Sequence, residues 1–210
     1  FLDVDDWWDK KYLSSRASFF SDNDKDFFYC NRFTFYEKSN KLKKFRKVEL
    51  PNEKIYNYLA KDYFISISGL IIKKEIFDQV GMFNKDFNII GDFDLVMRIA
   101  KKFNGHATNE PLLFYRYHKS NFSKMNLDMF FNEFSKWFNN QVKLVDKDFL
   151  NNIKHFEKKL LYYEIKNLLV NSNKNLYLIS KIINYPDLLG KLKFLIVFFT
   201  PEQIINYLEK

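Results

Sequence analysis

Three carboxylates at the start of the chain are the first residues whose types and spacing could do chemistry. Asp3, Asp5 and Asp6 lie within FLDVDDWWD (residues 1–9), directly after two apolar residues and directly before two tryptophans. Like charges this close raise each other's pKa unless a cation lies among them. The stretch is therefore either a strand end that delivers oxygen ligands to a metal ion or an acidic turn on the surface. The spacing alone favours the surface turn.

A second acidic stretch, GDFDLVMR (residues 91–98), is predicted to begin a helix. Asp92 is expected at the N-cap, and the helix is expected to end at Gly105. Asp94 and Arg98 stand four residues apart and are expected to pair across one turn. The apolar face at helical spacing consists of Leu95, Val96, Ile99 and Phe103.

The elements that would position these carboxylates follow from hydrophobic periodicity, and they predict an α/β fold. Residues 1–6 are expected to be the end of a buried strand, and 7–23 show a loose helical spacing. Strands are expected at 27–39 and 112–118, with a turn in the basic region 39–44 between them. A short helix is expected within 49–62, and 63–81 is predicted as a strand, a glycine turn and a helix that Gly81 ends.

From about residue 124 the pattern changes to apolar residues three and four apart, which predicts an appendage of three or four helices. The expected organisation is therefore residues 1–123 as one α/β part and 124–210 as a helical C-terminal region. The run FLIVFF (194–199) is either a buried helix or a lysine-flanked contact with a membrane interface.

Composition limits the class of protein. The chain has 210 residues, of which 47% are hydrophobic and 20% aromatic, so it can bury a core and disorder is excluded. Cys30 is the only cysteine, which excludes an internal disulfide or a cysteine-based zinc site and fits a reducing, cytoplasmic location. No signal peptide and no apolar run of about 18 residues is present, so a membrane span is not expected.

The net charge of +8 is concentrated partly in KSNKLKKFRK (38–47) and partly in the last third of the chain. Such runs are either a solvated face or a surface for nucleic acid, anionic lipid or a phosphorylated substrate. No RNA-binding aromatic signature or helix-turn-helix pattern accompanies them, so nucleic acid is not an expected partner. Peripheral contact with an anionic membrane, on its inner face, is the expectation that the basic appendage adds.

Four stretches, in this order, resemble the family-2 inverting glycosyltransferases, whose nucleotide-sugar-binding fold is of the GT-A type. They are FLDVDD for the family's FLDxDD, SGLIIKKEIFDQVGMF for a small-residue turn before a VGxF element, GDFDLVMR for [ED]DxDLxxR, and YRYHKSNFS for YRxHxxNxS. The resemblance covers residues 1 to about 123. Because the family carries a nucleotide-binding segment before FLDxDD, the chain is expected to be the C-terminal part of a catalytic domain, with that N-terminal part missing.

The resemblance implies a sugar transfer from a nucleotide-sugar donor to a glycan or lipid-linked glycan, in polysaccharide biosynthesis of the cell envelope. It implies Mn²⁺ or Mg²⁺ as cofactor, because a hard divalent cation stabilises the charge of the leaving diphosphate. By the same resemblance Asp5 is a direct metal ligand, Asp3 contacts the ribose or the metal, and His118 completes the metal site. Without that context a single histidine is usually structural. Asp6 is expected to make a local hydrogen bond.

Asp92 matches the family's catalytic base, which takes the proton from the acceptor hydroxyl. A helix N-terminus is expected to lower its pKa and keep it ionised; the alternative is a simple N-cap. Gly91 replaces the glutamate that often binds the acceptor. The remaining residues expected at the substrate are Trp8, stacking on a sugar or packing in the core, Ser68 and Gly69 in the small-residue turn, Arg116 facing the diphosphate, and Ser123 at a phosphate.

Two readings from other classes remain open. The chain could be a non-catalytic fragment or degenerate paralogue that acts as an interaction module. It could also be a basic surface binder, whose binding would fall steeply with salt and would not depend on Asp5 or Asp92.

Overall fold

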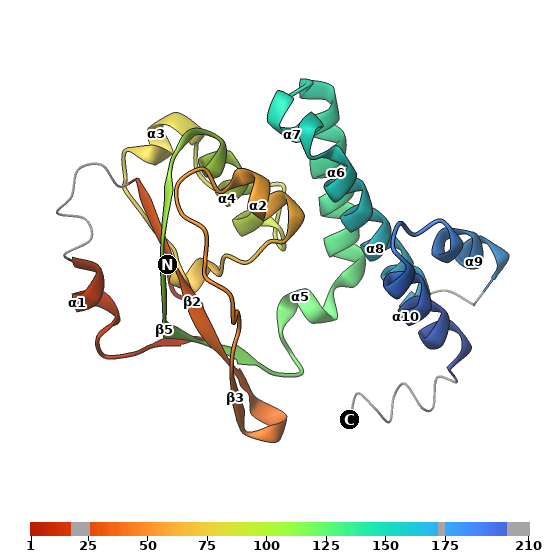
Figure 1. Cartoon of the computed structure of the whole chain (residues 1–210), viewed down its shortest axis with the longest axis horizontal. Coiled ribbons are helices and arrows are strands. Elements are labelled where there is room, and N and C mark those ends of the chain that lie inside the picture. Colours follow the sequence, from red (N-terminus) through yellow and green to blue (C-terminus); the bar gives the residue numbers. More distant parts are fainter. Residues whose placement is uncertain (18–25, 172–174, 201–210) are drawn as a thin grey trace. The chain divides into compact units, whose positions relative to one another are not determined.

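The computed structural model describes residues 1–17, 26–171 and 175–200, without the side chains of residues 123 and 124. The chain divides into two compact units, Phe1–Met125 and Asn126–Lys210. The first unit contains a mixed β-sheet and the second contains helices (Figure 1).

The sheet of the first unit has five strands in the order β1-β5-β2-β3, with β4 paired to β2. β2 and β5 run parallel, and the other pairs are antiparallel. The protein is thus a mixed α/β chain with a helical C-terminal region. The strands are β1 (Trp7–Trp8), β2 (Phe27–Tyr36), β3 (Lys41–Lys44), β4 (Ile71–Ile72) and β5 (Gly105–Tyr117).

β2 forms the centre of the sheet because its sequence, FFYCNRFTFY, is rich in aromatic and β-branched residues that suit a pleated, buried surface. Its first five residues are buried, and the prediction of a strand here is confirmed. The turn predicted at residues 39–44 is shorter than expected: the chain turns through Ser39 and Asn40, and Lys41–Lys44 form the edge strand β3. β5 is longer than predicted because the polar residues from Gly105 onward pair with β2 from Phe27 onward.

Along the chain, the helices of the first unit lie between the strands, except α5, which follows β5. They are α1 (Tyr12–Ala17), the 3-10 helix η1 (Glu37–Ser39), α2 (Tyr56–Lys61), the 3-10 helix η2 (Ile67–Gly69), α3 (Ile76–Val80), α4 (Gly91–Lys102) and α5 (Phe122–Met125). The short helix predicted within 49–62 is confirmed as α2. Gly81 follows α3 with a φ of 78°, so the prediction that it ends this helix is also confirmed.

The predicted strand at residues 1–6 is wrong. Phe1 and Leu2 are exposed, and the backbone makes a turn in which the Asp6 N–H donates to the Asp3 carbonyl at 3.2 Å. Trp7 and Trp8 are not helical either, because they pair with β5 as the short strand β1. A strand needs a neighbour for its backbone hydrogen bonds, and in the described chain that neighbour begins alongside Trp7.

Two predictions around α4 are also wrong in detail. The N-cap is Ile90, so Asp92 is the second residue of the helix. The helix ends at Lys102, and Gly105 instead begins β5, where it exchanges backbone hydrogen bonds with Glu53 at 2.6 and 2.8 Å. The expected apolar face is nevertheless buried at Leu95, Val96 and Ile99.

Residues 63–72 also differ from the prediction, because the strand lies after the glycine turn and not before it. η2 forms the turn, and β4 follows it and pairs with Phe27 and Phe28 of β2. A side chain at Gly69 would lie 3.0 Å from the Cys30 sulfur and 3.1 Å from Leu113, so this glycine lets η2 pack tightly on the sheet.

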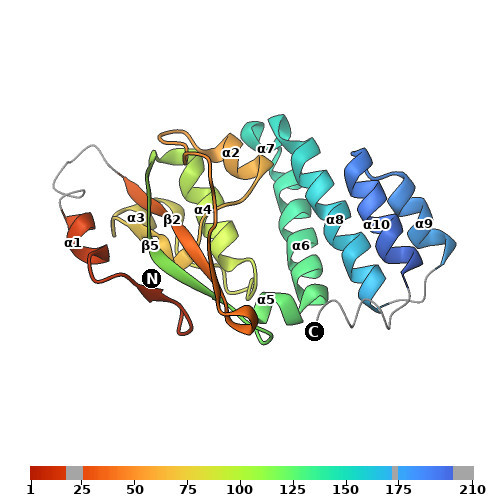
Figure 2. The same ribbon diagram turned by 60° about the horizontal axis from the view of Figure 1, so that its bottom comes forward.

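In the second unit the described residues form four helices of eight or more residues and the short α7, in line with the predicted helical appendage. They are α6 (Leu127–Leu144), α7 (Lys147–Asn151), α8 (Ile153–Asn171), α9 (Leu176–Ile183) and α10 (Leu188–Phe199). Helices α8, α9 and α10 lie side by side (Figure 2). No helix in the described ranges is long and apolar enough to cross a membrane.

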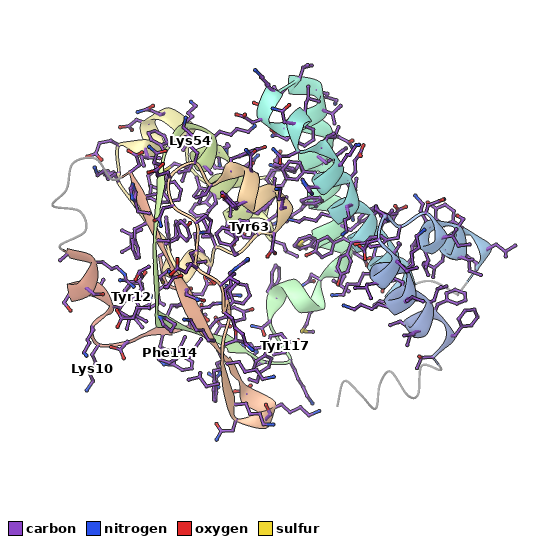
Figure 3. The ribbon with its side chains drawn as sticks, in the orientation of Figure 1. Lys10, Tyr12, Lys54, Tyr63, Phe114 and Tyr117 are labelled. Carbon is purple, nitrogen blue, oxygen red and sulfur yellow. The ribbon has the colours of Figure 1, made fainter. Side chains whose placement is uncertain are left out.

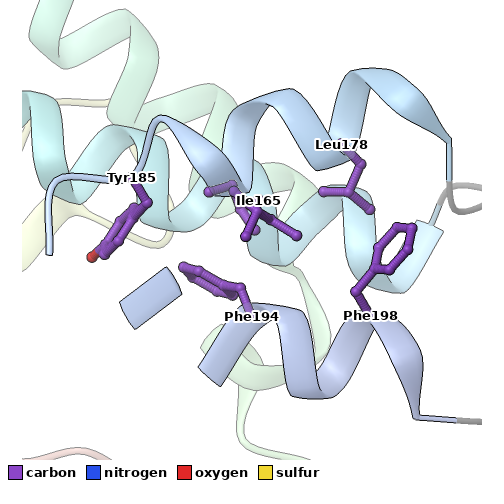
Figure 4. Packing of buried hydrophobic residues seen from close by; sticks show 6 residues of the cluster. Ile165, Leu178, Tyr185, Phe194 and Phe198 are labelled. Atoms are coloured by element: carbon purple, nitrogen blue, oxygen red, sulfur yellow. The ribbon is translucent and has the colours of Figure 1, made fainter. Parts of the chain in front are cut away.

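The run FLIVFF lies in α10 and is only half buried. Phe194 and Phe198 pack with Ile165, Leu178 and Tyr185 in one apolar cluster (Figure 4). Ile196 and Phe199 on the same helix are exposed. The buried-helix reading therefore holds for one face of α10.

Two adjacent phenylalanines of α10 give a matched test of this packing. Phe198 is 8% exposed and Phe199 is 74% exposed. We expect Phe198→Ala to lower the free energy of unfolding by about 3 kcal/mol, because it leaves a cavity, and Phe199→Ala to change it by less than about 0.5 kcal/mol. Urea unfolding followed by circular dichroism measures both. Equal losses in the two variants would show that the cluster is packed differently.

Candidate active site

The acidic loop is held in place by Asp6, which is buried. Its Oδ2 accepts a hydrogen bond from the Ser68 hydroxyl at 2.6 Å, and its Oδ1 accepts one from the Arg116 backbone N–H at 3.0 Å. The backbone of Asp6 makes the expected local hydrogen bond, to the Asp3 carbonyl, whereas the partners of its carboxylate lie 62 and 110 residues away. Asp6 thus joins the acidic loop, η2 and β5. Burial raises its pKa, and the two hydrogen bonds oppose that rise.

Ser68 is fully buried beneath the same loop. Besides donating to Asp6, its hydroxyl accepts a hydrogen bond from the Asp3 backbone N–H at 3.1 Å, and its carbonyl accepts one from the Trp8 indole at 2.7 Å. These contacts give Ser68 a positioning role. Its predicted contact with a substrate stays a prediction.

Asp5 lies against His118, as the resemblance implies for these two residues. Asp5 Oδ2 is 2.8 Å from His118 Nε2, and His118 Nδ1 is 3.0 Å from the Ser120 hydroxyl. Both side chains are partly exposed. The contact joins positions that lie 113 residues apart in the chain.

The loop that presents His118 is held by Asn121, the asparagine of YRxHxxNxS, to which the sequence analysis assigned no role. The Asn121 Oδ1 accepts from the His118 backbone N–H at 2.7 Å, and its Nδ2 donates to the Arg116 carbonyl at 3.1 Å. Asparagine three residues after the histidine is a turn-forming residue of the kind that bonds its neighbouring backbone, which is the signal that could have identified it.

Asp92 is the second residue of α4, and its carboxylate accepts a hydrogen bond from the Phe93 N–H at 2.6 Å. Its pKa is raised to about 6, chiefly by burial and then by the charge of Asp3, while backbone hydrogen bonds oppose the rise. The expectation that the helix N-terminus lowers this pKa is therefore wrong, because loss of hydration outweighs the helix dipole. Burial, followed by the charge of Asp5, also raises the pKa of Asp3.

Tyr63, labelled in Figure 3, is a further residue beside Asp92 that the sequence did not single out. Burial and then the charge of Asp92 raise the pKa of its phenol, and its ring meets Phe93 edge-on at 5.2 Å. Among the described residues its buried hydroxyl has no hydrogen-bond partner. An isolated tyrosine in YFISIS carries no recognisable signal of this position.

The two tryptophans after the acidic loop are both on β1. The Trp8 ring stacks on Tyr12 with a centroid distance of 4.5 Å, so part of it serves the core. Trp7 is exposed and stacks on Phe114 of β5, which Figure 3 labels, at 5.2 Å. The Trp8 ring is partly buried, so core packing accounts for one part of it, and the stacking of a sugar on the rest stays a prediction.

The other predicted residues are arranged as follows. Arg116 is exposed and its guanidinium pairs with Glu37 at the start of η1. Gly91 is the buried first residue of α4, next to Asp92. Gly69 is buried against the sheet. The backbone of Ser123 belongs to α5, and its side chain lies outside the described part of the chain.

The site offers few side chains to a divalent cation. Within the described ranges no group of three or more His, Cys, Asp or Glu side chains converges closely enough to hold a metal ion. Asp5 and His118 offer two neighbouring ligand atoms 2.8 Å apart. Mg²⁺ usually takes one or two carboxylates from the protein and completes its shell with substrate phosphates and water. The pair therefore fits a cation that binds together with a diphosphate.

Comparison of the chain with models of protein families and with curated protein sequences finds no match. The conclusions about function below therefore depend on the sequence motifs and on the geometry of this site.

Removing the Ser68 hydroxyl should release the acidic loop. We expect Ser68→Ala to lower the free energy of unfolding by about 1–3 kcal/mol, because Asp6 stays buried with one hydrogen bond fewer. Ser14, which is exposed on α1 and bonds within its own turn, provides the control: Ser14→Ala should cost less than about 0.5 kcal/mol. Urea unfolding measures both, and equal stabilities of the two variants would exclude the anchoring role.

For Asp92 we expect the opposite effect: because its pKa is raised, replacing it should increase the free energy of unfolding. Because its pKa is about 6 in the folded chain and the ordinary value is 3.8, the ionised form costs stability as pH rises through about 6. Relative to the parent, Asp92→Asn should gain about 1–2 kcal/mol in the free energy of unfolding between about pH 4 and about pH 7.5. The control is Asp78→Asn on exposed α3. A gain in the free energy of unfolding that does not change with pH would contradict the raised pKa of Asp92.

Proposed function

We propose that the chain carries catalytic residues of an inverting glycosyltransferase of the GT-A type, which transfers a sugar from a nucleotide donor to a glycan or lipid-linked glycan. The observation that carries the proposal is the contact between Asp5 and His118, from the first and the fourth of the stretches that resemble the family. Asp6 adds a second link between these stretches, through the Arg116 backbone.

The second support is the position of Asp92. The charge of Asp3 acts on its carboxylate, which supports assigning the third stretch to the same site. A pKa of about 6 suits a general base near neutral pH, since the group is mostly ionised and still holds a proton well. The charge of Asp3 in the acidic loop thus acts on the proposed base.

In the proposed reaction Asp92 takes the proton of the acceptor hydroxyl while the oxygen of that hydroxyl bonds to the anomeric carbon. The bond from that carbon to the diphosphate oxygen breaks on the opposite face, and the electron pair leaves with the nucleoside diphosphate. Asp5 and His118 would hold Mn²⁺ or Mg²⁺, which when bound neutralises charge on the diphosphate. Asp6, Ser68 and Asn121 keep the two loops in register.

Nucleoside-diphosphate release from a panel of sugar nucleotides with Mn²⁺ and a glycan acceptor tests the proposal, using the chain in its natural full-length form. Asp92→Asn should lower kcat by about 10²–10⁴-fold with nucleotide binding retained. Asp5→Ala should abolish metal-dependent nucleotide binding, and the surface control Asp78→Asn should leave both unchanged.

Titration of nucleotide and Mn²⁺ by calorimetry separates the alternatives. Binding without release would indicate that the acceptor in the assay is the wrong one, and a second acceptor panel would follow. No metal-dependent binding of any nucleotide would contradict the proposal and favour the interaction-module reading.

A further inference from the structure

A strongly basic segment lies outside the candidate site, at residues 37–48, which we call the basic hairpin. It comprises η1, β3 and the four residues after β3, at the edge of the sheet (Figure 1). Six of the ten residues 38–47 are lysine or arginine and none is acidic. The proposed transfer reaction uses none of these residues.

The basic hairpin is firmly built onto the sheet. β3 pairs with β2 in the register Tyr36↔Lys41 to Phe33↔Lys44. After β3, the Phe45 N–H donates to the Arg32 carbonyl at 2.9 Å, and the side chain of Asn31 bonds both backbone groups of Arg46. The lysines are therefore presented by a fixed backbone.

Exposed apolar side chains alternate with these lysines. Leu42 is 47% exposed, Phe45 is 39% exposed and Val48 is 63% exposed. Lysine on an edge strand is a common device against sheet-to-sheet aggregation, which would account for the charge. That role does not account for large apolar residues on the same hairpin.

The end of the basic hairpin also borders an open hollow of about 330 Å³, lined by Phe45, Arg46, Lys47, Val48 and Asp62. Arg46 pairs with Asp62 at 2.6 Å, so the exposed lysines supply most of the positive field there. The Arg32 guanidinium covers one face of the Phe45 ring at 3.7 Å. That face is closed to a stacking base, which disfavours single-stranded nucleic acid as the partner.

We propose that the basic hairpin docks the protein on an anionic lipid bilayer, with its lysines at the headgroups and Leu42 and Val48 entering the boundary between headgroups and acyl chains. Charge complementarity selects the anionic surface, and the exposed apolar residues select lipid over a purely ionic partner. The inference does not depend on the proposed transferase activity.

Vesicle co-sedimentation of the full chain tests this docking, with vesicles of phosphatidylcholine containing about 30 mol% phosphatidylglycerol. The protein should bind these vesicles, should not bind pure phosphatidylcholine, and should be released as NaCl rises from about 0.05 to about 0.5 M. Failure to bind the anionic vesicles at low salt would overturn the proposal.

Matched variants locate the surface. Replacing Lys41, Lys44 and Lys47 with Glu should weaken vesicle binding by at least about 100-fold. The same charge change at exposed Lys10, Lys74 and Lys85 is the control. The factor by which it weakens vesicle binding should be at least about ten times smaller than the factor for the hairpin variant. Equal losses in the two triple variants would overturn a specific hairpin contact. Thermal unfolding of each variant confirms that it is folded.

A further pair of variants tests the apolar part. Leu42→Ser with Val48→Ser should weaken binding about tenfold even though the charge is unchanged. The matching variant on α10, Leu192→Ser with Ile196→Ser, should have no effect. Loss only in the α10 variant, or tighter binding to a single-stranded RNA oligonucleotide than to vesicles, would overturn the proposal.

Discussion

The arrangement of the candidate site depends on one buried carboxylate. A charge taken out of water is costly unless hydrogen bonds replace its hydration. Asp6 satisfies this condition with a hydroxyl from η2 and a backbone N–H from β5. Because both bonds are needed, the acidic loop, the small-residue turn and the end of β5 are fixed to one another. The contact between Asp5 and His118 is then a consequence of that framework.

Acidic groups gather at this end of the sheet although the whole chain carries a net charge of +8. The charges of Asp3, Asp5, Asp6 and Asp92 act on one another, and burial raises the pKa of Asp3, Asp6 and Asp92. The charge of Arg32 couples to Asp6, and its guanidinium lies over the rings of Phe45 and Tyr115. A cluster with so little internal compensation favours a bound cation, which supports the proposed use of Mn²⁺ or Mg²⁺.

The positive charge is concentrated elsewhere, and in the first unit it is strongest on the basic hairpin. The two regions are nevertheless connected, since Glu37 at the base of the hairpin pairs with Arg116, two residues before His118. Tyr36 and Tyr117, the latter labelled in Figure 3, meet at 5.3 Å beside that ion pair. A docked hairpin would hold the acidic loop near a bilayer, an arrangement that suits a lipid-linked acceptor if the proposed transfer occurs.

The sequence by itself determined which segments could be buried: the aromatic run of β2, the apolar face of α4 and the helical periodicity after residue 124 are local patterns, and all three are confirmed. The candidate chemistry came from the resemblance of four sequence stretches to a family, which implied the roles of Asp5, Asp92 and His118. Tertiary structure decided the rest. Residues 1–6 form no strand, Trp7 and Trp8 pair with β5, and Asp6 is a long-range anchor. Partners of a buried group and the loss of its hydration depend on segments far apart in the chain, so the raised pKa of Asp92 and the position of Tyr63 could not be predicted from local sequence.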